Sequence, residues 1–424
     1  MNEISKMKQK GFEMVKFKGY EFVDGGVCAA EGFTAGGVIA GIKAGNVTKR
    51  DLAMIYCAER CKTAALFTSN KVKGAPILVS KEHLKDGYAQ AIIVNSGNAN
   101  TCNPDGVEIA ETMCELTAQA LDINSNDVLV ASTGVIGQKL DIKPIRIMIP
   151  TLSKSLSKKN SGDAVEAIMT TDTRKKEVAV EFELDGRKCH VGGMSKGSGM
   201  INPSMATMLA FITTDVCIAQ ELLEKALRKV NAITYNMVSV DGDTSTNDSL
   251  FLMSSGLAKN PEIICEDKNY EVFENALYAV MMNLARETAR DGEGATKLIE
   301  CIVNNAPTEK TAKSVAKSVI SSSLVKAALF AADANWGRIL CAVGYAEGEF
   351  EMDKISVELA SAKGKMTVCV DGAGISFSED VAKDILSDDE IKILVDLHSG
   401  HNSAVAWGCD LTFDYVKINA EYRT

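Results

Sequence analysis

The sequence of 424 residues lacks long apolar runs and has no excess of positive charge. No stretch approaches the roughly 20 apolar residues that cross a bilayer, and the first residues show no continuous apolar core of a signal peptide. The formal net charge is −10 at pH 7, whereas proteins that bind nucleic acid or anionic membranes carry basic patches. We therefore expect a protein that binds neither membrane nor nucleic acid.

Proline-rich linkers and closely spaced cysteine pairs are also missing. With seven prolines, no low-complexity segment and no short repeat, the chain is neither a solenoid nor a string of modules. The twelve cysteines include no CxxC pair and lie in apolar surroundings, which is typical of free thiols in a reducing cytoplasm. We therefore expect a cytoplasmic protein.

Two pairs of residues have the spacing of metal ligands. Cys57 and Cys61 are expected to share a helical face, but no second ligand pair accompanies them. His398 and His401 stand in a glycine-interrupted segment without an evident acidic third ligand, so we expect exposed loop histidines. The sequence therefore predicts no metal site and no bound cofactor.

The residues that are present have the proportions of a globular protein with a substantial core. Hydrophobic residues make up 46% of the chain and charged residues 24%. The chain is long for one domain, so two or three packed subregions are expected. Helical and strand patterns alternate along it, and hairpins mixed with crossover helices predict an α/β protein with mixed sheets covered by helices.

Individual elements are predicted from the period of the apolar residues. Alternation predicts hairpins around Asp185-Gly186 and Lys363-Gly364, and it also predicts a strand near the C-terminal end, at 412–422. Buried strands are predicted at 91–94, 128–131 and 208–212, and helices at 107–121, 222–230 and 273–284.

The segment 192–215 is the most suggestive of chemistry. A glycine-rich, charge-poor loop leads through Pro203 to Thr207, which stands at the start of an apolar strand. One interpretation is an ordinary glycine-rich turn that enters a core strand, where threonine is common. The other is that the Thr207 hydroxyl, held at the start of a rigid strand, attacks the carbonyl of the small residue Ala206.

The second interpretation is a complete chemical sequence. An N-to-O acyl shift at Ala206 gives an ester, which water can hydrolyse. Cleavage exposes the α-amine of Thr207, and the reference pKa of such an amine is about 7.7–8.0. Near neutral pH this amine can act as a base beside its own hydroxyl. One residue then supplies the nucleophile and the base, and no histidine is required.

The loop and several other segments resemble one known family. Residues 196–209, KGSGMINPSMATML, look like the self-cleavage signature of the ornithine acetyltransferase family, also called the glutamate N-acetyltransferase family. Further segments resemble blocks of the family in the family's order: Val94–Asn100, Ser132–Gly137, Met169–Thr173, Asp241–Asp248, Asp291–Lys297, Asn335–Arg338 and Trp407–Thr424. Because these blocks cover nearly the whole chain, the sequence is identified as similar to this family throughout.

The resemblance implies a fold and an activity. The fold is a layered αββα-type sandwich, and the activity moves an acetyl group from N-acetylornithine to glutamate in arginine biosynthesis. Thr207 would attack the amide and hold the acetyl group as an ester in a ping-pong cycle. Thr133 and Gly134 match the family's oxyanion hole. Some members also use acetyl-CoA, which is therefore a candidate co-substrate.

The resemblance also implies a set of substrate contacts. They fall on Thr173, Lys196, Thr207, Glu293, Asn419 and Thr424. By its chemistry Lys196 fits a substrate carboxylate, and Glu293 fits a cation or a proton relay. The alignment is least secure at Thr173, where the neighbouring Thr170 and Thr171 would fit as well.

Cleavage between Ala206 and Thr207 would give the fragments 1–206 and 207–424. The first contains the oxyanion hole and part of the substrate pocket, and the second contains the N-terminal threonine and a C-terminal pocket wall. We expect the fragments to be interleaved in one core and to stay together, because separation would expose apolar surface. The resemblance implies that two such pairs form an α2β2 heterotetramer.

Two other functions remain open from the sequence. One is a self-cleaving aminopeptidase or amidase that uses water as the acceptor, although such relatives usually begin with serine. The other is a non-enzymatic binding protein on the same fold, which would have an intact chain.

Overall fold

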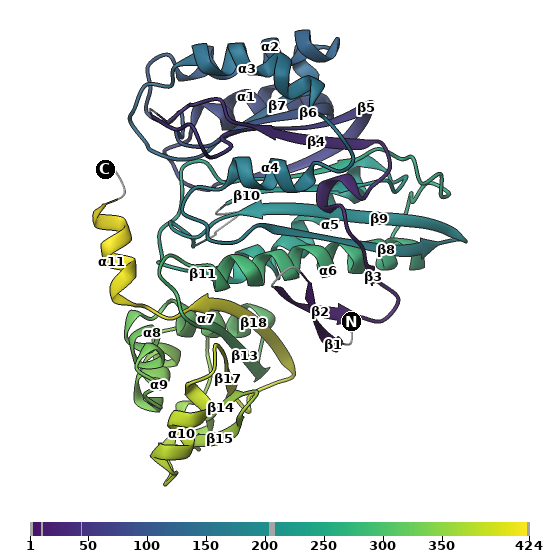
Figure 1. Ribbon diagram of the computed structural model, residues 1–424. Coiled ribbons are helices and arrows are strands. Elements are labelled where there is room, and N and C mark those ends of the chain that lie inside the picture. The colour runs from purple at the N-terminus through teal and green to yellow at the C-terminus, as the bar shows by residue number, and fades with distance from the viewer. Residues whose placement is uncertain (1–2, 10–11, 44, 203–207, 422–424) are drawn as a thin grey trace. The chain divides into compact units, whose positions relative to one another are not determined.

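A computed structural model describes residues 3–9, 12–43, 45–202 and 208–421 (Figure 1). The chain divides into two compact units, which are described in turn. The first unit is Met1–Gly197, Ser204–Ala232 and Thr244–Leu284, and the second is Ser198–Pro203, Ile233–Asp243 and Ala285–Thr424.

Nine strands of the first unit, counted over the described residues, form one mixed sheet. They are β3 (Glu21–Phe22), β4 (Phe33–Val38), β5 (Leu52–Phe67), β6 (Tyr88–Asn95), β7 (Val128–Ser132), β8 (Lys176–Leu184), β9 (Arg187–Lys196), β10 (Leu209–Thr214) and β12 (Ser249–Ser254). Their order is β3-β8-β9-β10-β12-β5-β6-β7, with β4 also paired to β5. The pairs β6–β7 and β10–β12 are parallel, and the other pairs are antiparallel. A hairpin of β1 (Glu3–Gln9) and β2 (Phe12–Phe17) precedes this sheet.

The helices of the first unit cover this sheet. α1 (Ala75–His83), α2 (Gly106–Leu121) and α3 (Ile142–Lys154) lie over one face of β5, β6 and β7 (Figure 1). α5 (Gln220–Asn231) packs against β5. α6 (Lys268–Arg290) packs against β9, since a Cβ on Gly193 would meet Val280 and Leu284. Short 3-10 turns η1 (Gly26–Cys28), η2 (Leu84–Asp86) and η3 (Ser125–Asp127) connect these elements.

One apolar core joins the two halves of the sheet. It contains inward residues of β5, β6 and β7 together with Met194, Phe211 and Phe251 from β9, β10 and β12. α4 (Ser161–Ile168) packs against the same core. The two halves of the sheet face each other across this core, and helices cover their outer faces, so the layers are helix, half-sheet, half-sheet and helix. This arrangement confirms the predicted α/β class with mixed sheets covered by helices. Burial on both faces explains why β10 and β12 are apolar along almost their whole length.

Strands from both sides of the predicted cleavage site are neighbours in this sheet. β9 precedes the site and β10 follows it, and their antiparallel register pairs Lys196 with Leu209. β10 in turn pairs with β12, and β12 with β5. Pulling the predicted fragments 1–206 and 207–424 apart would break two of these strand ladders, β9–β10 and β12–β5.

Most elements predicted from periodicity are confirmed. The hairpin β8–β9 turns at Asp185-Gly186, where both residues have positive φ angles. A second antiparallel hairpin joins β14 (Ser356–Ser361) and β15 (Gly364–Val370). The buried strands β6, β7 and β10 and the helices α2, α5 and α6 also occur where they were predicted.

The prediction that Cys57 and Cys61 share a helical face is wrong. Both side chains are buried in the long strand β5. This strand is paired along its length with β4, β6 and β12, and its register to β6 shifts between Tyr56 and Cys61. Ladder bonds with three neighbouring strands outweigh the helical spacing of a few apolar residues.

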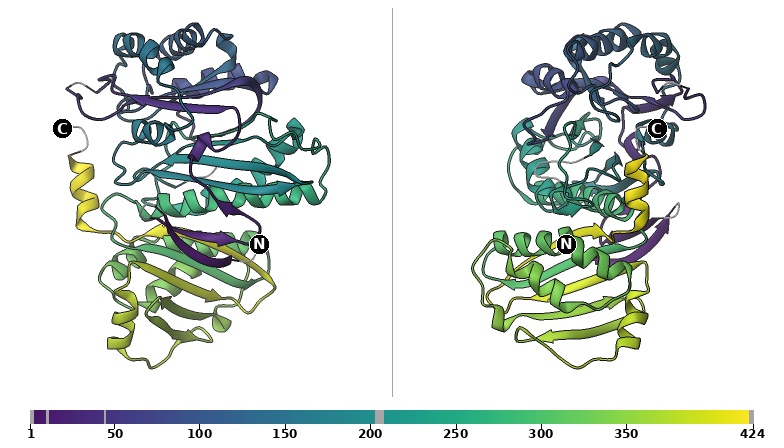
Figure 2. Two further views of the ribbon diagram at one scale, coloured as in Figure 1. Left: turned by 45° about the vertical axis from the view of Figure 1, so that its right-hand side comes forward. Right: turned by 90° about the vertical axis from the view of Figure 1, so that its left-hand side faces the viewer.

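Seven strands of the second unit, among the described residues, form another mixed sheet. In spatial order they are β11 (Val238–Ser239), β18 (Asn402–Cys409), β13 (Leu298–Ala306), β17 (Glu390–Asp396), β14, β15 and β16 (Ala373–Gly374). The helices are α7 (Glu309–Ser321), α8 (Ser323–Phe330), α9 (Trp336–Gly344), α10 (Glu379–Leu386) and α11 (Phe413–Ala420), with 3-10 turns η4 (Tyr235–Met237) and η5 (Met352–Lys354). Figure 2 shows α7 lying along β13 and β18.

The prediction of a strand at 412–422 is wrong, because Phe413–Ala420 form helix α11. No residue of α11 is buried, and Phe413 and Val416 are 84% and 66% exposed. A strand needs a neighbouring strand to satisfy its backbone, and this segment pairs with none among the described residues. A helix satisfies its backbone internally, so it is the structure that an exposed segment can adopt.

No helix among the described residues is long and apolar enough to cross a membrane.

Candidate active site

The turn Thr133–Gly134 follows the C-terminal end of β7 and is held tightly. The N–H of Thr133 donates to the carbonyl of Asn95 at 3.0 Å, and the N–H of Val135 donates to the carbonyl of Gly97 at 3.4 Å. Gly134 has a φ angle of 131°, and a Cβ at this position would collide with the Gly97–Asn98 peptide. Only glycine fits there, so the direction of the backbone is fixed.

Two donors at this turn remain available to a ligand. Among the described residues, neither the N–H of Gly134 nor the hydroxyl of Thr133 has a hydrogen-bond partner. Both residues are partly exposed. Two preorganised donors of this kind can stabilise the oxyanion of a tetrahedral intermediate, provided that it forms within hydrogen-bond distance of both.

The segment before β12 links this turn to the start of β10. The N–H of Ser249 donates to the carbonyl of Met208 at 2.9 Å. Two residues earlier, Nδ2 of Asn247 donates to the carbonyl of Ser132 at 3.0 Å. The residue that follows Thr207 in the chain is therefore connected, through three successive residues, to the residue that precedes Thr133. Ala206, Thr207 and Thr424 themselves lie outside the described residues, and their roles stay predictions.

A buried ion-pair cluster centres on Asp172. One carboxylate oxygen accepts from Lys176 Nζ at 2.8 Å and from the Gly197 N–H at 2.7 Å. The other accepts from the Thr170 N–H at 3.0 Å and lies 3.9 Å from Lys196 Nζ. Burial alone would raise the pKa of Asp172, but the charges of Lys176 and Lys196 outweigh it and hold the pKa well below its usual value. Asp172 is therefore ionised at neutral pH, and its negative charge lies beside the ammonium group of Lys196.

Lys196 and Thr173 flank this cluster differently. Lys196 ends β9 and is buried, with 7% of its surface exposed, so it is no ordinary solvated loop lysine. Thr173 follows Asp172 directly and is exposed. Both predicted residues are therefore close to the Asp172 carboxylate. Lys196 approaches it with its ammonium group, and Thr173 is the next residue in the chain.

Asp248 is a second buried carboxylate near Lys196, and it has the opposite character. It is 2% exposed, and burial raises its pKa well above the usual range, although hydrogen bonds from Ser245 and Thr68 and the charge of Lys196 oppose this shift. Its Oδ2 atom has no hydrogen-bond partner among the described residues. A carboxyl group in this environment favours the protonated form.

In the second unit, Glu293 and Asn419 are in direct contact. Nδ2 of Asn419 donates to Oε2 of Glu293 at 2.8 Å, and the N–H of Glu293 donates to the Ser198 carbonyl at 2.9 Å. A Cβ on Gly199 would collide with the Glu293 carboxylate, so the glycine-rich loop passes directly over it. Helix α11, rather than the predicted strand, carries Asn419.

Asp241 anchors the same loop in the second unit. Its carboxylate accepts from the N–H groups of Met200 and Ile201 at 2.6 and 2.9 Å. Burial raises the pKa of Asp241, and burial next to Asp241 and Glu293 also raises the pKa of Tyr415 far above its usual value. The Asp241 carboxylate therefore holds the loop that leads to the predicted cleavage site, in the part that the structure describes, which ends at residue 202.

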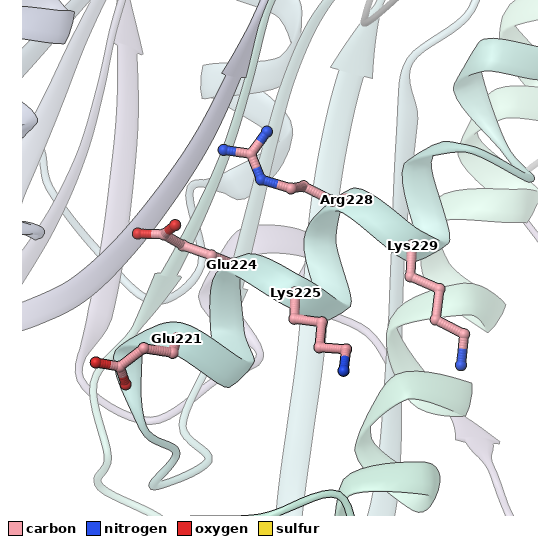
Figure 3. Close-up of a pocket in the computed structure, with 5 residues that line it drawn as sticks. All are labelled: Glu221, Glu224, Lys225, Arg228 and Lys229. Atoms are coloured by element: carbon pink, nitrogen blue, oxygen red, sulfur yellow. The ribbon is translucent and has the colours of Figure 1, made fainter.

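A pocket on the solvent side of α5 contains none of the predicted site residues (Figure 3). Its lining residues all come from this one helix: Glu221, Glu224, Lys225, Arg228 and Lys229. Charged residues of both signs along one exposed helical face are typical of a solvated surface. The pocket therefore does not compete with the groups around Thr133 and Lys196.

No cluster of His, Cys, Asp and Glu among the described residues has the arrangement of a metal site. His398 and His401 are exposed, and Nδ1 of His398 lies 3.3 Å from Asp396.

Sequence reasoning missed three polar residues of this region: Asp172, Asn247 and Asp248. All three are buried. They stand in two of the segments that resemble family blocks, 169–173 and 241–248. Asn247 and Asp248 also lie directly before an apolar strand, a position that could have drawn attention to them.

The fold and these groups define a mixed α/β enzyme with prearranged hydrogen-bond donors at a strand end. The sequence matches the ArgJ family over residues 34–424. The chain belongs to the ArgJ family, and this confirms the resemblance found in the sequence.

Curated relatives are similar over nearly their full lengths. The arginine biosynthesis bifunctional protein ArgJ of Caldanaerobacter subterraneus subsp. tengcongensis is 48% identical over 405 residues, which cover 95% of this chain and 100% of the relative. Arginine biosynthesis bifunctional protein ArgJ 1 of Clostridium acetobutylicum is 49% identical over 393 residues, which cover 92% of this chain and 96% of the relative.

Solved structures match parts of the chain. The arginine biosynthesis bifunctional protein ArgJ of Bacillus halodurans has 44% identity and a TM-score of 0.47, over 50% of this chain and 97% of that chain. The ornithine acetyltransferase of Mycobacterium tuberculosis, in complex with ornithine, has 34% identity and a TM-score of 0.40, over 44% of this chain and 100% of that chain.

Proposed function

We propose that this chain is a self-cleaving glutamate N-acetyltransferase of arginine biosynthesis, which moves the acetyl group of N-acetylornithine to glutamate. Family membership over residues 34–424 supports the activity, as do full-length relatives named arginine biosynthesis bifunctional proteins. The observation that carries the mechanism is the pair of donors at Thr133–Gly134, which have no partner among the residues that the structure describes and are tied through Asn247 and Ser249 to the start of β10.

The first step is cleavage of the chain. The hydroxyl oxygen of Thr207 attacks the carbonyl carbon of Ala206, the Ala206–Thr207 amide bond breaks, and the Thr207 nitrogen leaves as an amine. Water then hydrolyses the ester and leaves a carboxylate on Ala206. The products are the fragments 1–206 and 207–424, with Thr207 at the start of the second.

The second step is acetyl transfer by a ping-pong cycle. The α-amine of Thr207 takes the hydroxyl proton as the oxygen attacks the acetyl carbonyl of N-acetylornithine. Ornithine leaves with that proton on its amine, and the acetyl group remains as an ester on Thr207. The amine of glutamate then attacks the ester carbonyl, the bond between the acetyl carbon and the Thr207 oxygen breaks, and N-acetylglutamate leaves. The proton that the amine loses passes through the α-amine of Thr207 to the Thr207 oxygen, which restores the hydroxyl. We further propose acetyl-CoA as a second donor of the same acetyl group, as the family resemblance implies.

The other predicted site residues stabilise the oxyanion or bind the charged groups of the substrate. The hydroxyl of Thr133 and the N–H of Gly134 stabilise the oxyanion in both half-reactions. Lys196, which lies beside Asp172, binds the substrate carboxylate. Glu293 binds the side-chain ammonium of the substrate or relays a proton, and Asn419 orients Glu293. We place Thr173 and Thr424 at the pocket by resemblance alone.

Assembly and location are part of the same proposal. The fragments stay together because β9 and β10 share a sheet, and two pairs of fragments form an α2β2 heterotetramer, as the family resemblance implies. The twelve cysteines are all free thiols, which fits a cytoplasmic enzyme. The reaction requires no metal and no bound cofactor.

Electrophoresis under denaturing conditions with N-terminal sequencing tests the cleavage. We expect two bands of near-equal mass, one of which begins with the sequence TMLAF. Thr207→Ala should give a folded, uncut and inactive chain. An uncut wild-type chain with full activity would contradict the proposal.

Product analysis tests the acceptor. The protein is incubated with N-acetylornithine, with and without glutamate. N-Acetylglutamate is the expected product when glutamate is present. If only acetate forms, the chain is an amidase that uses water, and if hydroxylamine traps no acetyl group, it is not an acyltransferase.

A further inference from the structure

The side chain of Asn247 uses its whole hydrogen-bonding capacity at one place. It lies two residues before the first residue of β12 and is 6% exposed. Its Nδ2 atom donates to the carbonyls of Ala99 at 2.6 Å and Ser132 at 3.0 Å. Its Oδ1 atom accepts from the hydroxyls of Thr101 at 2.5 Å and Thr246 at 2.7 Å. An amide offers two donors and two acceptor positions, and all four are occupied.

The two acceptor carbonyls stand on either side of the Thr133–Gly134 turn. Ser132 directly precedes the turn. Ala99 is tied to the residue after the turn, since its N–H donates to the carbonyl of Val135 at 3.0 Å. One amide group therefore holds both ends of the turn.

Neighbouring groups leave the amide little freedom. A Cβ on Gly74 would lie 2.6 Å from Nδ2 of Asn247, so the backbone of Gly74 packs directly on the amide. Next to it, the hydroxyl of Ser132 donates to Oδ1 of Asn95 at 2.6 Å, and Nδ2 of Asn95 donates to the carbonyl of Asn98 at 2.9 Å. A saturated buried network of this kind fixes one geometry.

We propose that Asn247 is a positioning residue for acetyl transfer, which sets the place of the Gly134 N–H and the Thr133 hydroxyl. The inference rests on the proposed oxyanion role of these two groups. Asn247 follows the predicted cleavage site, whereas Ser132 and Ala99 precede it. The fragment 207–424 thus sets the geometry of a turn that belongs to the fragment 1–206.

The effect of Asn247 should appear in kcat rather than in KM. Donors that act on the oxyanion stabilise the transition state and not the bound substrate, and such losses lower kcat while leaving KM nearly unchanged. A displacement of about 1 Å in a catalytic group costs roughly 10²-fold in rate. For Asn247→Ala we expect kcat about 10²-fold lower and a KM for N-acetylornithine within about threefold of wild type.

The experiment uses the full-length protein after its own cleavage, and the acetyl-enzyme burst counts the competent sites. Because kcat is referred to these sites, misfolded molecules do not contribute. Asn283→Ala is the matched control. Asn283 is equally buried, donates to the carbonyl of Val15 at 3.1 Å and accepts from its N–H at 2.8 Å, but it touches no part of the turn. This control should lower the melting temperature and leave kcat unchanged.

A double variant separates positioning from general stabilisation. If Asn247 acts through the turn, Thr133→Ala combined with Asn247→Ala should retain clearly more activity than the product of the single effects allows. A full product of the two losses would overturn the inference. If Thr133→Ala lowers kcat and Asn247→Ala does not, the inference is wrong and the proposed function stands. If Thr133→Ala is fully active, the oxyanion role fails, and the inference fails with it.

Two milder variants serve if Asn247→Ala does not fold. Thr101→Val removes one hydroxyl that orients the Asn247 amide and should lower kcat by about threefold to tenfold without changing KM. Asn247→Asp can donate only when its new carboxyl group is protonated, so its kcat should fall as the pH rises, in a step that wild type lacks. Wild-type kcat in Thr101→Val, or a wild-type pH profile in Asn247→Asp, would contradict the inference.

Discussion

The two groups of predicted site residues are built in different ways. In the first unit, Thr133, Gly134 and Lys196 stand at strand ends, and their neighbours Asp172 and Asn247 are buried and held by several hydrogen bonds each. In the second unit, Glu293 is buried in a turn that follows α6, but its partner Asn419 comes from the exposed helix α11. The difference teaches that the oxyanion donors and the lysine are fixed by the sheet, whereas the Glu293 group depends on one exposed helix.

Substitutions in the first group should therefore cost stability as well as activity, and those in the second group should cost activity alone.

The largest expected effect is on stability, in Asp172→Asn. The variant removes the carboxylate that lies 2.8 Å from the buried Lys176 Nζ, and loss of one partner of a buried pair costs about 3–5 kcal/mol. Urea unfolding at pH 7 measures this loss. Asp163→Asn is the control, since Asp163 is 37% exposed beside Arg50 and its loss should cost less than about 1 kcal/mol.

Asp172 also gives the pH dependence a definite sign. Its pKa is lower in the folded than in the unfolded chain, where the reference is about 3.9. Its contribution is complete at pH values above the unfolded pKa and is lost as the pH falls towards the folded pKa. Wild type should lose stability relative to Asp172→Asn below about pH 4. If the difference in free energy of unfolding between wild type and Asp172→Asn were the same at acid and neutral pH, the cluster would not be an ion pair.

The next effect is on rate, in Gly134→Ala. The added methyl group meets the Gly97–Asn98 peptide, and the φ angle of 131° is strained for alanine. The turn must shift, and we expect kcat to fall by about 10²-fold. Gly137→Ala is the control, since this glycine has a φ angle of 76° but open space around its Cβ. Similar losses in both variants would point to backbone strain alone.

In the second unit we expect a smaller effect, in Glu293→Gln. The amide retains the shape and can still accept from Asn419, but the charge is lost. If Glu293 binds the substrate ammonium, KM for N-acetylornithine should rise by about tenfold, which corresponds to roughly 1.4 kcal/mol of lost binding. The melting temperature should stay within about 2 °C of wild type. A large loss of stability would contradict the contrast between the two groups.

The smallest effect concerns an ion pair further along β9. Nδ1 of His190 lies 2.7 Å from Asp215, and this hydrogen bond raises the pKa of His190 although partial burial opposes the shift. A raised folded pKa stabilises at pH values below the unfolded pKa of about 6.5 and loses its effect as the pH rises through the folded pKa.

His190→Gln should therefore cost on the order of 1 kcal/mol at pH 5.5 and less at pH 8.5. Activity should not change. Thermal unfolding of both proteins at the two pH values measures the difference. A cost that grew with pH would mean that the neutral imidazole, and not the ion pair, stabilises the strand.

Whether the sequence predicted an element correctly depends on whether that element is formed by local or by distant contacts. The hairpin β8–β9 was predictable, because alternation runs along Val178–Leu184 up to the Asp185-Gly186 turn. The strand β5 was not, because its helical spacing around Cys57 and Cys61 is overruled by pairing with three distant strands. Helix α11 was also missed, because alternation over few residues cannot show whether a partner strand exists.

Some residues of the candidate site could be named from the sequence, and others only from the structure. Thr133, Gly134 and Lys196 were named from a resemblance between short segments. In the described part of the chain, the donors of Thr133 and Gly134 have no partner, and Lys196 lies beside the buried carboxylate of Asp172. Asp172, Asn247 and Asp248 were not named, since a single aspartate or asparagine in a sequence carries no sign of burial. Their importance comes from hydrogen bonds to residues far along the chain, such as Asn247 to Ser132.

By itself the sequence determined the alternation of helices and strands, the mixed α/β class, the family and the segments that contain the chemistry. These are local properties: apolar periodicity, glycine where φ is positive, and short ordered blocks. Only the tertiary structure decided which carboxylate is charged, which donors remain free and which amide holds them. Those properties depend on desolvation and on partners brought together from distant parts of the chain, and no local pattern records either.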